Sequence, residues 1–222
     1  MDEYSDHRRR LALLALIGSG AGLTGALRFA LAQPATAQGL RRARGNVTVN
    51  GRPASVGNRI SASDVVATGR RGLAVFVIGQ DAFLMRASSR AEFSGKDTLV
   101  DALRLATGKL LSVFGGGRAK RLSTHTATVG IRGTGAYLES DAARTYFCLC
   151  YGTADVAAAG SAMRESYTTT HHESPRYIYG DGRIDAIAAA SVINHTDAEL
   201  IMLEALVGRK PPKAFMDDPF RY

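Results

Sequence analysis

Hydrophobic and polar residues alternate with a period of two from Gly45 to about Thr153, and glycines interrupt the alternation at short intervals. Asn50-Gly51 is the strongest two-residue hairpin signal in this stretch. Leu73 to Ile78 is a continuous apolar run, which indicates a buried strand. Many short strands separated by Gly and Asn turns predict a mainly β fold, either a β-solenoid-like module or a sandwich.

The pattern changes beyond Thr153. Arg164 to Glu173 predicts one more polar strand. Thr196-Asp-Ala-Glu199 has the form of a capping box, in which the Thr side chain and the Glu side chain bond each other's backbone amides. Leucines then recur at helical spacing up to Gly208. These signals predict one short helix near residues 197–207.

Residues 1–37 have the features of an export signal. Arg8-Arg9-Arg10 precede an apolar run of 17 residues from Leu11 to Leu27, and Ala35-Thr36-Ala37 offers a small-x-small cleavage site. The run is shorter than the roughly 20 residues that span a bilayer core. The arginines and the weakly apolar run resemble a twin-arginine leader. We expect cleaved export to the periplasm, or anchoring to the inner membrane if the leader is not cleaved.

Removal of 37 of the 222 residues leaves 185, enough for one domain and an extension. The pattern places a β domain over residues 45–165 and a C-terminal extension over residues 166–222. The full chain carries a net charge of +8, but its arginines are scattered or lie in short groups without interleaved aromatic residues. Nucleic acid is therefore not an expected partner, whereas an anionic surface or an envelope protein is.

Several short motifs occur in a specific order along the β domain: Asp64-Val-Val-Ala-Thr-Gly69, paired strands over Leu73 to Met85, Leu105-Ala-Thr-Gly-Lys-Leu110, and Val129-Gly-Ile-Arg-Gly-Thr134. In this order they resemble the FecR-type periplasmic domain family. The resemblance covers roughly residues 45–165, and it implies a β-solenoid-like periplasmic module.

Complete FecR regulators carry a cytoplasmic anti-sigma segment and a membrane helix ahead of this module, whereas seven residues precede the first arginine here. We therefore expect no direct sigma-factor control by this chain alone. The resemblance implies a module that senses or binds a protein or ligand in the cell envelope. An anchored component of an iron-uptake signalling route is an alternative that rests on family association alone.

The two cysteines of the chain, Cys148 and Cys150, lie in an alternating strand. Alternation places them on one face with Tyr146, and it places Phe147, Leu149 and Tyr151 on the other. A disulfide between them is not expected, because residues i and i+2 of a strand lie about 6.6 Å apart, near the upper limit for bridging. The thiols are therefore core residues, metal ligands or partners in a bond between molecules.

Three histidines follow the cysteines: His171, His172 and His195. A turn at Ala157 to Ser161 would return the chain beside the cysteine strand, and alternation lets only one of the two adjacent histidines face the thiols. The candidate ligands for zinc or copper are therefore Cys148, Cys150, His171, His172 and His195. The two cysteines, one of the adjacent histidines and His195 could together form a set of four ligands. The spacing matches no standard zinc finger, so core thiols and ordinary polar histidines are the alternative.

Catalytic motifs are weak in this chain. Gly115 to Lys120 lacks the spacing of a phosphate-binding loop, and no Ser-His-Asp group or carboxylate pair stands out. The sequence therefore predicts a protein that is not an enzyme. Its leading function is an exported FecR-like binding or sensing module, and a periplasmic metal-binding or metal-sensing protein is the main alternative.

Overall fold

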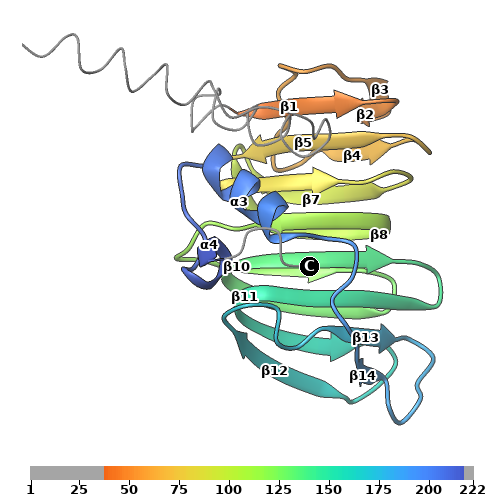
Figure 1. Cartoon of the computed structure of the whole chain (residues 1–222). Coiled ribbons are helices and arrows are strands. Elements are labelled where there is room, and N and C mark those ends of the chain that lie inside the picture. Colours follow the sequence, from red (N-terminus) through yellow and green to blue (C-terminus); the bar gives the residue numbers. More distant parts are fainter. Residues whose placement is uncertain (1–37, 218–222) are drawn as a thin grey trace, which may run out of the picture.

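The computed structural model of the protein describes residues 38–217, so the export signal predicted over residues 1–37 lies outside the described residues. The described part contains 14 strands and two short helices, which confirms the mainly β prediction (Figure 1). The strands are β1 (Gly39–Arg44), β2 (Val47–Val49), β3 (Arg52–Pro53), β4 (Val65–Thr68), β5 (Leu73–Ile78), β6 (Asp81–Met85), β7 (Arg90–Lys96), β8 (Leu99–Val113), β9 (Ala119–Ser123), β10 (Ala127–Ser140), β11 (Arg144–Ala158), β12 (Arg164–Thr169), β13 (Arg176–Tyr179) and β14 (Ile187–Ala189). The helices are α3 (Asp197–Leu206) and α4 (Ala214–Asp217).

Three long strands, β8, β10 and β11, each run through two layers of sheet. The first half of β8 pairs with β7, whereas its second half pairs with β6 and β10. The first residues of β11 pair with β13, and its last residues pair with β12. The two layers are thus parts of one open sheet, and its strands are stacked roughly in chain order from β1–β3 at one end to β12–β14 at the other (Figure 1).

We call the layer that α3 contacts the helix-side layer. It contains β1, β5, β6, β13, β14 and the halves of the long strands that pair with them. The far layer contains β2, β3, β4, β7, β9, β12 and the remaining halves. This arrangement combines features of both predicted folds, because two layers pack face to face while single strands pass from one layer to the other.

The space between the layers is filled by apolar side chains, which we call the inner core. Phe76 and Phe83 of the helix-side layer and Phe93 of the far layer pack ring to ring, with centroids 5.0–5.7 Å apart. Side chains alternate across a strand, so the neighbours of these residues point to the opposite surface of the helix-side layer. We call that surface the outer face, and α3 and α4 cover it (Figure 1).

The long strands bend where glycines adopt positive φ angles. Gly133 in β10 has φ 52° and Gly152 in β11 has φ 104°, and the register between the two strands shifts there. A Cβ atom on Gly152 would lie 2.4 Å from Cγ2 of Thr134, so both backbone conformation and space favour glycine. β8 likewise continues through Gly108, which has φ 92°.

Two local predictions are confirmed. Asn50 and Gly51 have φ angles of 52° and 77° and join β2 to β3 in a hairpin. Thr196 and Glu199 form the capping box at the start of α3. The C-terminal extension differs in carrying a second short helix, α4, after the two prolines that follow α3. Within residues 38–217, no helix is both long enough and apolar enough to cross a membrane.

Candidate metal centre

Four of the five residues predicted as metal ligands meet beneath α3, on the outer face. Cys148 and Cys150 come from β11, His172 from the loop after β12, and His195 from the segment that leads into α3. All four side chains are buried. The site therefore joins the sheet to the C-terminal extension, out of contact with solvent.

The separations of the ligand atoms fit a single small cation. Nδ1 of His172 lies 3.4 Å from Sγ of Cys148 and 3.2 Å from Nε2 of His195. One ligand atom from each of the four residues lies within 4.8 Å of all the others. Neighbouring ligand atoms of a tetrahedral zinc ion lie about 3.3–3.8 Å apart, given Zn–S and Zn–N bonds of about 2.0–2.3 Å. The four residues therefore fit a zinc ion with little movement.

Both thiols lie on the outer face, as alternation predicts, and β11 has a bulge at Cys150. Gly135 pairs with Tyr151 and Ala136 pairs with Leu149, so Cys150 is an extra residue between two register positions. The bulge turns Tyr151 to the outer face beside the cysteines. The prediction that Tyr151 lies on the face opposite the cysteines is therefore wrong, because strict alternation does not continue through the bulge.

Hydrogen bonds from the opposite ring nitrogens orient both histidines. Nδ1 of His195 lies 2.7 Å from the carbonyl oxygen of Ile193, which only accepts, so this nitrogen donates and Nε2 faces the thiols. Nε2 of His172 lies 2.9 Å from Oδ1 of Asp197, so Nδ1 faces the thiols. Metal-binding histidines typically use a carboxylate or a carbonyl in this way. The described residues thus include groups that could support a metal site as well as its candidate ligands.

Electrostatics favour one ionised thiol. Hydrogen bonds from Cys150, His172 and His195 hold the pKa of the Cys148 thiol well below its usual value, although burial acts against them. Burial, together with the nearby Cys148 sulfur, raises the pKa of the Cys150 thiol well above its usual value. A divalent cation would stabilise both thiolates, since the thiolate is the form that binds metals.

His172 is held at the centre of the cluster. Burial alone would lower its pKa, but hydrogen bonds to Cys148 and Asp197 outweigh burial and raise the pKa. Its backbone N–H donates to the carbonyl of Cys150 over 2.9 Å, which fixes the loop to the cysteine strand. The backbone adopts φ 60°, a conformation that non-glycine residues rarely take. Strained residues of this kind cluster at functional sites.

His171 is not part of the four-residue cluster. Its Nε2 lies 2.7 Å from Oδ2 of Asp197, so the two carboxylate oxygens of Asp197 bind the two adjacent histidines. The next residue, Glu173, accepts hydrogen bonds from the backbone and hydroxyl of Thr170 and from the backbone of His171. These bonds outweigh partial burial and lower the pKa of Glu173 to about 2, so its carboxylate stays ionised and holds the loop.

Three residues that the sequence analysis did not select complete the site. Asp197 is fully buried, the Tyr137 ring stacks on the His195 ring with centroids 4.5 Å apart, and Phe215 of α4 contacts His172 edge-on at 5.2 Å. Asp197 lies two residues after a candidate histidine, which was a signal for a supporting carboxylate. The capping box from Thr196 to Glu199 explained this segment without any role for Asp197. Tyr137 and Phe215 carry no comparable signal in the sequence.

Comparisons with known proteins give little beyond this geometry. A scan against protein-family models gives no match, and neither does a search of curated proteins. Solved structures similar to this chain include two crystal structures, at 1.65 and 2.50 Å resolution, described as "a putative anti-sigma factor" from Parabacteroides distasonis ATCC 8503. They are 8% and 9% identical to this chain, each with a TM-score of 0.47.

The similar region covers 57% of this chain and 59% of each crystallised chain, so this chain matches about three fifths of their length. Similarity at this level assigns neither a family nor an activity. The resemblance to FecR-type domains therefore stays a prediction from the sequence motifs.

Proposed function

We propose that this chain is a non-enzymatic, metal-binding module of the cell envelope, in which one zinc ion joins the C-terminal extension to the β scaffold. The ion would be held by Cys148, Cys150, His172 and His195. The observation that carries the proposal is the convergence of these four buried residues, with both histidines oriented by hydrogen bonds from their other ring nitrogens.

The donor set favours a structural zinc site. Four protein ligands fill a tetrahedral site, whereas catalytic zinc sites keep one position for water or substrate. The four side chains are at most 3% exposed, so the site is closed to solvent, as structural sites are. Two thiolates and two imidazoles suit Zn²⁺, and copper is the alternative that the same ligands allow. When bound, such an ion supplies folding free energy.

The place of action rests on sequence features. The leader pattern over residues 1–37 supports export, and the ordered motifs over residues 45–165 support a FecR-like role in sensing or binding through protein or ligand contacts. In this proposal the metal centre stabilises the module or reports metal supply, because it links β11 to the segment that carries α3.

Metal analysis of the full chain tests the proposal. The protein is purified without a histidine tag, and its zinc and copper contents are measured by mass spectrometry. We expect about one zinc ion per chain. The variant Cys148→Ser/Cys150→Ser should contain none. Cobalt substitution adds a second measurement, because thiolate-to-cobalt absorption should appear in the wild-type chain and disappear in the double variant.

Two histidine variants serve as matched controls. His125 is exposed and lies outside the cluster, so His125→Ala should keep the metal, whereas His172→Ala should lose it. If neither metal nor cobalt absorption is found in the wild-type chain, the thiols are core residues. In that case the double Ser variant would lose stability through buried hydroxyl groups alone.

A further inference from the structure

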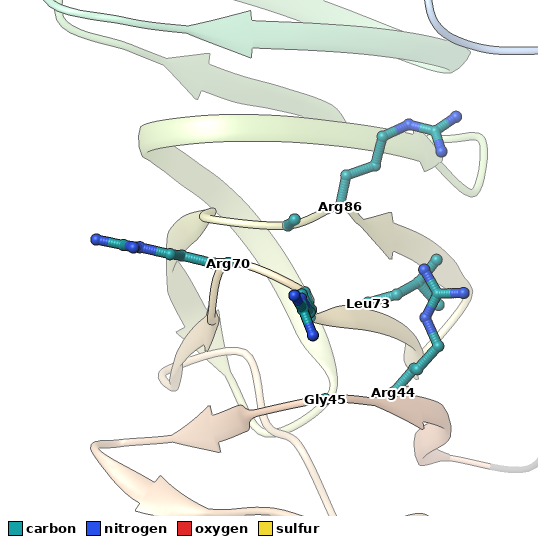
Figure 2. A pocket seen from close by; sticks show the side chains of 8 residues that line it. Arg44, Gly45, Arg70, Leu73 and Arg86 are labelled. Atoms are coloured by element: carbon teal, nitrogen blue, oxygen red, sulfur yellow. The ribbon is translucent and has the colours of Figure 1, made fainter.

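An arginine-lined cavity lies beside the first strands of the helix-side layer, apart from the metal centre. Its volume is about 600 Å³, within the range of small-molecule sites. Its lining includes Arg44, Arg70, Arg71 and Arg86, with Gly45 and Leu73 between them (Figure 2). No acidic residue is among the described residues that line it.

Strand pairing brings these arginines together. Arg44 ends β1, Arg71 lies in the turn between β4 and β5, and Arg86 directly follows β6. β5 pairs with β1 on one side and with β6 on the other, so the three strand ends are neighbours. Gly45 allows the close approach, because a Cβ there would lie 2.7 Å from the carbonyl oxygen of Arg71.

The positive charge of the cavity is poorly compensated. Arg44, Arg70 and Arg71 are exposed, and none of them forms an ion pair with a residue in the described part of the chain. Figure 2 shows Arg44 beside Leu73, whereas the Arg70 side chain points away from both of them. Like charges that line one cavity without counter-charges among the described residues repel one another, and an anion bound there would reduce this repulsion.

Arg86 is the exception among the four arginines. One of its terminal nitrogens donates to both carboxylate oxygens of Glu199, at 2.9 and 2.8 Å, and to the carbonyl oxygen of Asn194 at 2.7 Å. Its Nε is buried and has no hydrogen-bond partner. Arg86 therefore places its positive charge beside the cavity while it is tied to the segment that carries His195.

We propose that this cavity binds a small, free, multivalent anion of the phosphate class. Guanidinium groups match phosphate oxygens through paired N–H donors, and several of them are needed to balance a multivalent anion. We commit to a free anion because the cavity, which three strand ends border, has the volume of a small-molecule site. The site does not depend on the metal centre.

Calorimetry with inorganic pyrophosphate and the full chain tests the site. The variant Arg44→Ala/Arg71→Ala should bind pyrophosphate at least tenfold more weakly than the wild type. Its thermal unfolding should be unchanged, because both side chains are exposed. The matched control is Arg52→Ala/Arg121→Ala, which removes the same charge from exposed positions outside the cavity. The control should bind as the wild type does.

Glu199→Gln tests the part played by Arg86. Glutamine can still serve in the capping box, but it removes the charge that pairs with Arg86. Pyrophosphate affinity should therefore rise two- to fivefold in this variant. An unchanged affinity would remove Arg86 from the site.

Three outcomes would overturn the proposal. The first is that pyrophosphate does not bind to the wild-type chain. The second is that both double variants weaken binding equally, which would indicate general charge attraction. The third is that the chain sediments with vesicles of phosphatidylglycerol through Arg44 and Arg71 while free pyrophosphate fails to compete, which would indicate a membrane surface as the ligand.

Discussion

The two faces of the helix-side layer are both buried, yet they are built from different chemistry. The inner core is almost entirely apolar, with phenylalanine rings from both layers in contact. The outer face carries tyrosines, two cysteines, two buried histidines and the fully buried carboxylate of Asp197. The same strands contribute to both faces, because their side chains alternate.

The contrast indicates what each face needs in order to fold. Apolar side chains in the inner core are stabilised by burial alone, at about 1.5–3 kcal/mol for a large side chain. Buried polar groups on the outer face destabilise the fold unless each has a partner. Tyr151 and Arg209 both bond Glu204 there, and the thiolates of Cys148 and Cys150 would gain a counter-charge from a metal ion. Stability should therefore depend on metal at one face only.

Truncation in the inner core should have the largest effect. Phe83 is fully buried and contacts three other phenylalanine rings. Phe83→Ala should lower the free energy of unfolding by about 3–5 kcal/mol through lost burial and a cavity. Chemical denaturation with and without a chelator measures this. The loss should be the same in both conditions, and a loss that vanishes on chelation would show that the two faces are not independent.

Removal of the metal should rank second. If free zinc exceeds the dissociation constant about a hundredfold, binding adds about 2.7 kcal/mol to stability. A chelator should therefore lower the melting temperature of the wild-type chain and leave that of Cys148→Ser/Cys150→Ser unchanged. Hydrogen exchange locates the effect: amides of the loop at residues 170–175 and of α3 should lose protection, whereas those of β5 should not. Uniform loss over the whole chain would contradict the comparison.

The fold was largely readable from the sequence because its signals are local. Alternation and glycines predict the strands, and the Asn50-Gly51 turn and the Thr196 capping box are short-range features. The passage of single strands through two layers was not predictable. It depends on bends at residues such as Gly152, and a glycine in a strand pattern is equally consistent with the end of a strand and with a bend in it.

Part of the candidate site could be predicted from the sequence for a related reason. Residue types identified Cys148, Cys150, His172 and His195, because thiols and imidazoles are the usual ligands of zinc. The different place of His171 and the role of Asp197 arise from how one loop packs against the start of α3. The face of Tyr151 was predicted wrongly because a bulge cannot be recognised from the alternation of apolar and polar residues.

Loss of the supporting carboxylate should have a smaller effect than loss of the metal. Asp197→Asn keeps the size of the side chain but weakens its hydrogen bonds to His171 and His172. Mutation of such supporting groups typically lowers metal affinity 10–100-fold, or about 1.4–2.7 kcal/mol. Competition with a metal indicator measures the affinity. The matched control is Asp217→Asn at the other short helix, which should not change it.

The smallest effect is expected at the helix cap. The Thr196 hydroxyl accepts a hydrogen bond from the Glu199 backbone, so Thr196→Ala should cost about 0.5–2 kcal/mol of stability. Metal affinity should stay within about twofold, because other contacts hold the segment before the cap. Arg86 donates to the carbonyl of Asn194, and the Asn194 side chain donates to Glu139. A fall in affinity as large as that of Asp197→Asn would show that the cap also positions His195.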